Sequence, residues 1–207
     1  MRRLTLILIS TGVALAVAQA VVTPSYAATV LQISVREMLN KSELVFEGHV
    51  TRVESRMDPP ATLIHTYVTF QIFDVIKGAR PDQTIELSFL GGTVDGRTLA
   101  VPGMQIPELG EQGIYFVESL ARDQVHPLYG WAQGHLRLSP SKGGALNVLT
   151  AQGVPVIGID HTQKGRSGEI SRGVAVGLVV DSDAPKEAGM SVKEFKGILR
   201  GWLERSP

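Results

Sequence analysis

The sequence predicts a mainly β protein: a small barrel, closed or partly open, with two short capping helices. Three observations support this prediction. Segments 44–55, 62–77 and 83–90 alternate apolar and polar residues with the period of two that strands require. In the first two segments the alternation changes phase once, which indicates β-bulges in long, bent strands of the kind that build small barrels. Asp95-Gly96, between two short strand candidates, is a strong hairpin signal.

Two capping boxes predict where the helices begin. Ser34 is followed three residues later by Glu37, and Ser191 by Glu194, so in each pair the serine hydroxyl can accept a hydrogen bond from the glutamate amide. We expect a short helix that starts after the first box and ends before Ser42. We expect a final helix after the second box, because apolar residues recur there at helical spacing: Phe195, Ile198, Leu199 and Trp202.

The remaining strand candidates are shorter. Those that would complete the barrel lie at 113–120, 125–131 and 135–138, and light edge strands follow at 146–150, 154–159 and 174–180. From residue 139 to residue 189 there is no aromatic side chain. We therefore divide the chain into a barrel domain with an N-terminal helix at 28–140 and a glycine-rich extension with short strands and a C-terminal helix at 141–207.

The first 27 residues have the pattern of a signal peptide. Two arginines precede an apolar run at 4–22, and small residues lead to a cleavage site between Ala27 and Ala28. The alternative is an uncleaved membrane anchor, since the run approaches the ~20 residues of a spanning helix. Pro24 and the small-residue site favour cleavage. We predict export to the periplasm or the medium.

Composition limits the partners. Twenty basic and twenty acidic residues give a formal charge of zero, and this balance does not favour nucleic acid or an anionic membrane as partner. The longest apolar run after the leader, 174–180, is too short to cross a bilayer, so no membrane association is expected after cleavage. There is no cysteine, and therefore no disulfide framework. No cofactor is predicted.

Neither catalysis nor a metal site is predicted. The chain has no Gly-x-Ser-x-Gly elbow, no His-Glu-x-x-His motif and no phosphate-binding glycine loop. On the predicted hairpin His49 and His65 would lie on the order of 10 Å apart, too far to share one zinc ion. His126 and His161 lack a spaced carboxylate, and His135 is expected to be half-buried. An enzyme with a dispersed site at His49, His65 or His135 stays as a lesser alternative.

Several motifs occur in a fixed order along the first two thirds of the chain: 42–50, 66–70, 75–78, 90–93, 101–103, 109–111 and 134–138. In this order they resemble an uncharacterised family of exported bacterial proteins that are often encoded near matrixin-type zinc metalloproteases. More distantly, the layout is similar to the netrin-like OB barrel of the tissue inhibitors of metalloproteinases, so the resemblance implies an OB-like fold.

In those inhibitors the first mature residue, a cysteine, presents its amino group and carbonyl to the protease zinc. The corresponding residue here is Ala28, followed by Thr29, and the disulfides that fix the inhibitor terminus have no counterpart. The resemblance therefore implies that Ala28 and Thr29 contact a partner, provided that something else holds residues 28–32 rigid.

Four further residues are candidates for binding. Gly91 and Gly92 lie at a strand end, where they allow either a sharp bend or the close approach of a partner. Tyr129 and Trp131 would form an aromatic platform for sugar or peptide, unless they belong to the core. We expect a non-enzymatic protein-binding module, a partner or inhibitor of an extracellular zinc metalloprotease. The alternative is a β-barrel that binds glycan or peptide.

Overall fold

The computed structural model describes residues 30–57, 63–79, 82–141, 143–163 and 168–205. These residues form a mainly β protein with two α-helices, as the sequence predicts. The helices are α1 (Val35–Lys41) and α2 (Val192–Glu204). Both begin at the expected caps, because Ser34 accepts a hydrogen bond from the Glu37 amide and Ser191 accepts one from the Glu194 amide.

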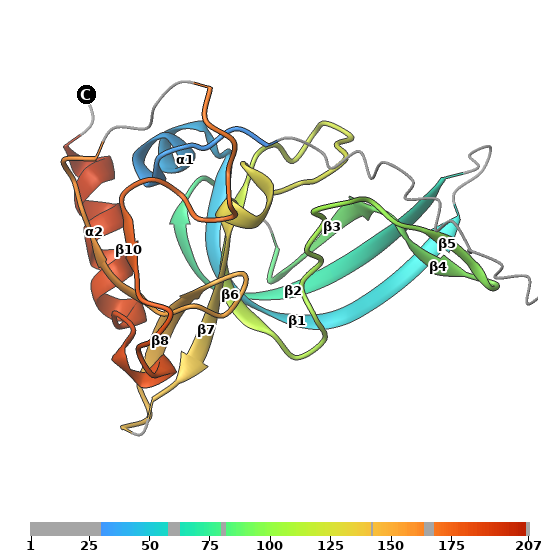
Figure 1. The fold of residues 1–207 in the computed structure, drawn as a ribbon. Helices are drawn as coiled ribbons and strands as arrows, with labels where there is room; N and C mark the ends of the chain where they lie inside the picture. The colour runs from blue at the N-terminus through green and yellow to red at the C-terminus, as the bar shows by residue number, and fades with distance from the viewer. Residues whose placement is uncertain (1–29, 58–62, 80–81, 142, 164–167, 206–207) are drawn as a thin grey trace, which may run out of the picture.

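Six antiparallel strands make the main sheet, in the order β3-β2-β1-β6-β7-β8. Their bounds are β1 (Leu44–Met57), β2 (Ile64–Lys77), β3 (Thr84–Leu90), β6 (Gln112–Val117), β7 (His135–Pro140) and β8 (Leu146–Thr150). The sheet does not close on itself, because β3 and β8 are its two edges. Figure 1 shows β1 and β2 as a long curved ribbon, with the helices at one end of the molecule.

Two small sheets and two short 3₁₀ helices complete the fold. Strands β4 (Gly92–Val94) and β5 (Arg97–Leu99) form a hairpin, and β9 (Val156–Ile159) pairs with β10 (Leu178–Val180). The 3₁₀ helices are η1 (Trp131–Gly134) and η2 (Lys186–Ala188). No helix among the described residues is long and apolar enough to span a bilayer.

The local turn and bulge predictions are confirmed. The pairing of β1 with β2 shifts register between Val50 and Arg52 and again between Glu47 and Gly48, where Phe73 of β2 is skipped. A third shift lies between Val45 and Phe46. The hairpin turn at Asp95-Gly96 has positive φ at both residues, 47° and 77°. This is the conformation that a two-residue hairpin turn requires, and it matches the twist of the flanking strands.

The predicted strand at 125–131 is wrong. Only the middle of this segment pairs with the end of β6, through a bridge between Val117 and Leu128 and a hydrogen bond from the Tyr129 amide to the Phe116 carbonyl. Extended backbone then ends, because Gly130 and Trp131 have φ of 69° and 59°. A left-handed conformation at two successive residues cannot continue a strand.

Each face of the sheet buries one apolar cluster. The helix-side cluster includes Val45 and Phe116 of the sheet together with residues of both helices: Val35, Met38, Leu39, Phe195, Leu199 and Trp202. The inner cluster lies on the opposite face, where Phe46, Phe70 and Tyr115 pack ring against ring. Neighbouring residues of β6 and of the first half of β1 alternate between the two clusters, so these parts of the sheet are buried on both faces, whereas β1 from Thr51 onward is exposed or partly exposed.

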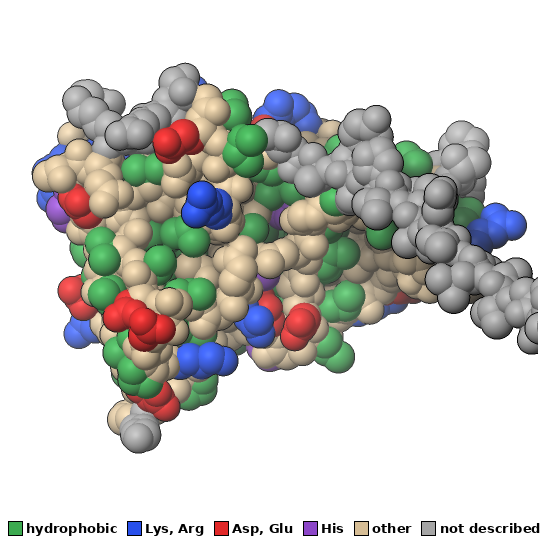
Figure 2. Space-filling model, viewed as in Figure 1, with side chains coloured by type: hydrophobic (Ala, Val, Ile, Leu, Met, Phe, Trp, Pro, Cys, Tyr) green, Lys and Arg blue, Asp and Glu red, His purple; other side chains and the backbone are tan. Residues whose placement is uncertain are grey.

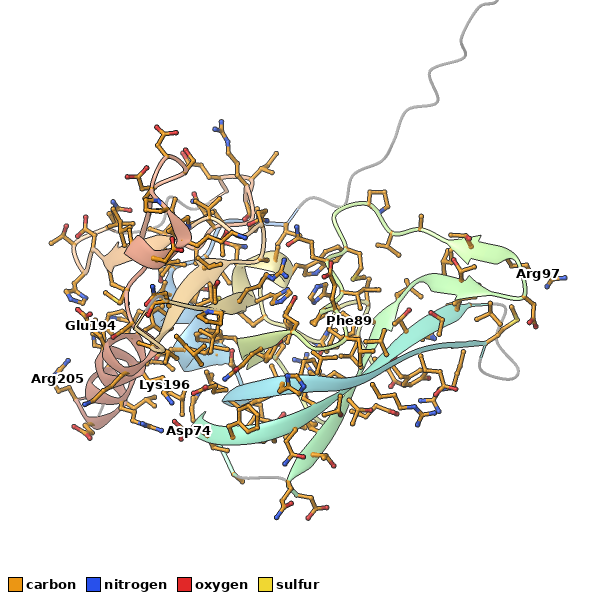
Figure 3. The ribbon with its side chains drawn as sticks, turned by 90° about the horizontal axis from the view of Figure 1, so that it is seen from below. Asp74, Phe89, Arg97, Glu194, Lys196 and Arg205 are labelled. Atoms are coloured by element: carbon orange, nitrogen blue, oxygen red, sulfur yellow. The ribbon has the colours of Figure 1, made fainter. Side chains whose placement is uncertain are left out.

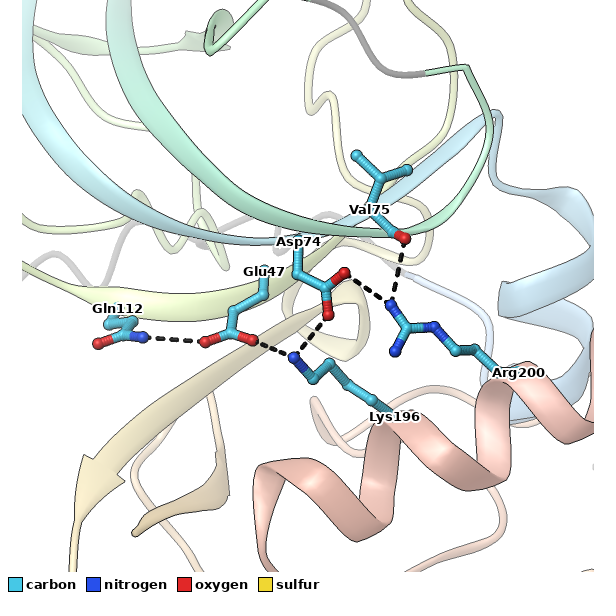
Figure 4. Close-up of polar contacts among 6 residues, drawn as sticks. All are labelled: Glu47, Asp74, Val75, Gln112, Lys196 and Arg200. Carbon is cyan, nitrogen blue, oxygen red and sulfur yellow. Dashed lines mark hydrogen bonds and ion pairs between the residues drawn. The ribbon is translucent and has the colours of Figure 1, made fainter. Parts of the chain in front are cut away.

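An ion-pair network fixes α2 on the sheet (Figures 3 and 4). The Lys196 ammonium lies 2.6 Å from Glu47 Oε2 on β1 and 2.6 Å from Asp74 Oδ2 on β2. Arg200 contacts the other oxygen of Asp74 at 2.6 Å, and Gln112 donates to Glu47 Oε1. Burial alone would lower the pKa of Lys196, but its two carboxylate partners outweigh burial and raise it.

Candidate binding surface

The N-terminal segment 30–33 is held by the side chain of Gln133, which comes from the 3₁₀ helix η1. Gln133 Oε1 accepts a hydrogen bond from the Ile33 amide at 3.0 Å, and Nε2 donates to the Leu31 carbonyl at 2.9 Å. The side chain also caps the Gly130 carbonyl, and Gln133 is buried. The glutamine amide thus takes the place of a peptide group in a neighbouring strand.

The opposite side of the same segment is paired with the chain around residues 169–176. Val30 accepts a hydrogen bond from the Ser171 amide, and the Gln32 amide donates to the Glu169 carbonyl, both at 2.8 Å. The Val176 amide then donates to the Ile33 carbonyl at 2.8 Å. Backbone and side-chain hydrogen bonds therefore hold this segment in a protein without cysteine. Ala28 and Thr29 lie outside the described residues.

A recess of about 350 Å³ opens beside this pinned segment. Its lining comes from five parts of the chain and includes Val30, Met104, Gln105, Trp131, Gln152 and Arg172. A volume of this order is within the range of sites that bind small molecules or side chains. Basic and acidic side chains are interspersed over the face shown in Figure 2, and neither sign forms a stripe there.

Trp131 lies in this recess with an unusual backbone. Its φ of 59° is rare for a bulky residue and must be held by its surroundings. The indole stacks on His126, with ring centroids 5.2 Å apart and 19° between the planes. The preceding Gly130 lies so close to Ile33 that a Cβ there would be 2.3 Å from its Cδ1. The N-terminal segment and the Trp131 turn therefore fix each other.

A polar cluster at the start of β6 and on β7 joins a buried carboxylate to a buried imidazole. His135 Nε2 lies 2.5 Å from Glu111 Oε1, Tyr115 donates to the same oxygen, and Arg137 Nε lies 3.2 Å from Oε2. Burial would raise the pKa of Glu111, but these partners outweigh it and lower the pKa. The side chains of Glu111 and His135 are only 5% and 3% exposed.

His126 is the second buried imidazole. Its Nδ1 accepts a hydrogen bond from the Leu128 amide, which assigns the proton to Nε2. Burial lowers the pKa of His126 to about 3, and the neighbouring His135 acts in the same direction. The imidazole is therefore neutral at ordinary pH, wedged between Phe89 and Trp131.

The structure places Gly91 and Gly92 where β3 turns into the β4–β5 hairpin. Their φ values are 109° and 135°, and a Cβ on Gly92 would lie 2.4 Å from Ser55 Oγ and 2.5 Å from Thr66 Oγ1. The Thr66 hydroxyl also donates to the Gly91 carbonyl. Close packing against β1 and β2 accounts for Gly92, and a Cβ on Gly91 would lie 2.9 Å from the Leu99 carbonyl oxygen of β5.

The two aromatic candidates have different surroundings. Trp131 lines the recess, whereas Tyr129 packs against the helix-side cluster and donates to Glu37 at 3.4 Å. Gln133, which joins Trp131 to the N-terminal segment, was missed by the sequence analysis. What could have pointed to Gln133 in the sequence is a single amide side chain between Ala132 and Gly134, immediately before the predicted strand at 135–138.

His49 and His65 lie farther apart than expected. Gln71 is opposite His49 and Arg56 is opposite His65, so seven positions of β1 separate the two pairs, on the order of 23 Å. The predicted register was wrong because it paired β1 with residues of β2 that lie three or four positions too early in the chain. Among the described residues no three acidic or histidine side chains gather as a metal site would require.

No family model, no curated protein and no solved structure matches this chain.

Proposed function

We propose that this protein is an exported, non-enzymatic protein-binding module that acts as a partner or inhibitor of an extracellular zinc metalloprotease. The observation that carries the proposal is the pinning of residues 30–33 beside an open recess. A segment already fixed in one conformation loses little conformational entropy on binding, so more of the contact energy is retained as affinity. The resemblance described above supplies the class of partner.

The free amino terminus is the proposed zinc-binding group. Cleavage after Ala27 would leave an α-amino group and a carbonyl on Ala28, only two residues before Val30 at the rim of the recess. In the inhibitors that the sequence resembles, the same pair of groups contacts the protease zinc. Thr29, the next residue in the sequence, is proposed to contact the same partner.

The burial of Glu111 and His135 supports a non-enzymatic role. An acid–base pair must reach the reacting group directly or through one water. These two side chains instead bond to each other, Tyr115 donates to Glu111 Oε1, and the partly exposed Arg137 pairs with Glu111 Oε2. Their arrangement is better suited to anchoring the loop before β6 than to catalysis.

We also propose that the curved sheet is a partly open OB-like barrel around the inner cluster. Two features support this: β1 is long, bulged and paired with both β2 and β6, and the Leu90 amide at the end of β3 donates to the Val125 carbonyl at 3.0 Å. That hydrogen bond brings the segment after β6 to the far edge of the sheet.

The test is an inhibition assay with a matrixin-type protease and the mature chain that begins at Ala28. The matched control is the same chain with its α-amino group acetylated, which removes the proposed zinc ligand and leaves the fold intact. We expect inhibition at micromolar concentration and at least a tenfold loss on acetylation. The absence of both inhibition and a complex at micromolar concentration would refute the proposal.

The recess also supports a second candidate, the binding of a glycan or a peptide by Trp131. Its position in the wall of a cavity of about 350 Å³ is the specific observation that favours this candidate. A panel of cell-wall fragments should then change the fluorescence of the protein, and Trp131→Phe should abolish the change. Unchanged fluorescence and no heat signal across the panel would count against it.

A further inference from the structure

The free edge of β3 has the features of a second binding site. The Gln83 carbonyl accepts from Ile72, and the Gly91 amide donates to the Ile64 carbonyl, so odd-numbered residues of this strand bond to β2. The Leu90 amide points the other way, toward the Val125 carbonyl. Because amide groups alternate along a strand, those of Glu86 and Ser88 face outward with Leu90.

No other described segment forms a backbone hydrogen bond with the outward groups of Glu86 and Ser88. A cavity of about 730 Å³ lies along this edge. Residues 85–88 line one side together with His65 and Tyr67 of β2, and Ser119, Leu120, Arg122, Asp123, Gln124 and Pro127 line the other. The opposite wall is therefore the segment 119–127. This segment is hydrogen-bonded to β3 at Leu90 and diverges from β3 toward Ser88 and Glu86.

We infer that this edge of β3 accepts an extended peptide segment of another protein as an additional strand. The outward amides supply the hydrogen bonds that such strand addition uses. A second copy of the chain is a poor occupant, because its edge strand would bring its own sheet against residues 119–127. An isolated extended segment meets no such obstacle.

The walls also indicate the composition of the peptide. Ile85 and Leu120 offer apolar contacts, and Leu120 is 44% exposed. Arg122 is paired with Glu118, whereas Asp123 forms no ion pair with another described residue. Alternating apolar and polar residues with one basic side chain opposite Asp123 would complement this surface.

This edge is distinct from the recess beside the N-terminal segment, since the two cavities share no lining residue. The inference therefore does not depend on the proposed inhibition of a protease. Binding here would move the amide signals of Glu86, Ser88 and Leu120, and binding at the recess would move those of Val30 and Trp131.

The probe is a synthetic heptapeptide of alternating valine and threonine with one central lysine, acetylated and amidated at its ends. It is titrated into the full mature chain and followed by amide NMR. We expect saturable shifts at Glu86, Ser88 and Leu120. A matched peptide with alternate backbone nitrogens methylated cannot donate along one edge, and we expect it to bind at least tenfold more weakly.

Two proline variants test the strand itself. Ser88→Pro removes an outward amide inside the cavity without removing a ladder bond to β2, and should abolish binding. Thr84→Pro removes an outward amide beyond the cavity and should leave binding intact. The inference fails if millimolar peptide leaves the Glu86 and Ser88 signals unmoved, or if the methylated peptide binds equally well. The peptide comparison uses the unmodified protein, so it decides the question even if Ser88→Pro does not fold.

Discussion

The side chain of Gln133 is hydrogen-bonded to the backbone amide of Ile33, one hundred residues earlier in the chain. This contact connects the turn that carries Trp131 to the N-terminal segment, and it lies beneath the recess for which a partner is proposed. The rigidity of the proposed binding surface therefore depends in part on one buried amide, beside the backbone hydrogen bonds to residues 169–176.

Gln133→Leu should free the N-terminal segment. The substitution leaves the Ile33 amide and the Leu31 carbonyl without their partners, which should cost about 2–3 kcal/mol of folding free energy. Hydrogen exchange at the Ile33 amide should accelerate more than exchange in α2. Gln152→Leu, an exposed glutamine on the recess, is the control and should change the free energy of unfolding by less than about 0.5 kcal/mol. Equal acceleration at Ile33 and in α2 would contradict a local role.

Lys196→Met should destabilise the protein more than Arg200→Met. Loss of Lys196 leaves Glu47, which is 6% exposed, without its cation, and an uncompensated buried charge costs about 3 kcal/mol. Arg200 is 44% exposed and its ion pair should contribute about 0–1 kcal/mol. Urea unfolding of the two variants measures the difference. Equal losses of unfolding free energy in the two variants would show that the stability of the network does not depend on the buried carboxylate of Glu47.

Stability should fall on mild acidification because of His126. Its pKa is about 3 in the folded protein and about 6.5 in the unfolded chain, so below pH 6.5 the unfolded state binds a proton that the folded state does not. Between pH 6.5 and pH 5 this should remove about 2 kcal/mol. His135 is the titratable group next to His126. The lowered pKa of Glu111 should add a further loss of stability, but only at lower pH.

His126→Phe should flatten this pH dependence, since phenylalanine fills the space between Phe89 and Trp131 without titrating. His161→Gln, at an exposed histidine, should leave the slope unchanged. The measurement is urea unfolding at pH 7, 6 and 5. A slope that survives in His126→Phe would assign the acid sensitivity to another group.

Gly92→Ala should destabilise the protein by about 2–4 kcal/mol. The new Cβ would overlap Ser55 Oγ and Thr66 Oγ1, and alanine disfavours the φ of 135°. Gly96→Asn is the matched control, because Gly96 faces open space and asparagine tolerates a left-handed turn. Thermal unfolding of both variants is the check. A small shift in the melting temperature of Gly92→Ala would mean that the backbone after β3 can move away from Ser55 and Thr66.

What the sequence could predict was local. Strand alternation, the serine caps and the Asp95-Gly96 turn each depend on residues a few positions apart, and all three are confirmed. Residues 125–131 were assigned to a strand because their composition is apolar and aromatic. The left-handed backbone of Trp131 depends on its stacking with His126 and on the contact between Gly130 and Ile33, which no local pattern encodes.

The candidate surface was only partly predictable for the same reason. Trp131 stands out by residue type, and Ala28 by its place after a cleavage signal. Gln133 and the 169–176 segment become visible only when the chain is folded, since each contacts the N-terminal segment across one hundred residues or more. Polar side chains that bond to distant backbone leave no periodicity in a sequence.

The shared packing of α1 and α2 has a consequence for the order in which the protein can fold. Met38 and Leu199 belong to one apolar cluster although 160 positions separate them, so the first helix stays uncovered until the last is available. Pairings this distant make folding slow. A chain that leaves a translocation channel N-terminus first would therefore stay incompletely folded until almost its whole length had emerged. The helix-side cluster would then form in one late step.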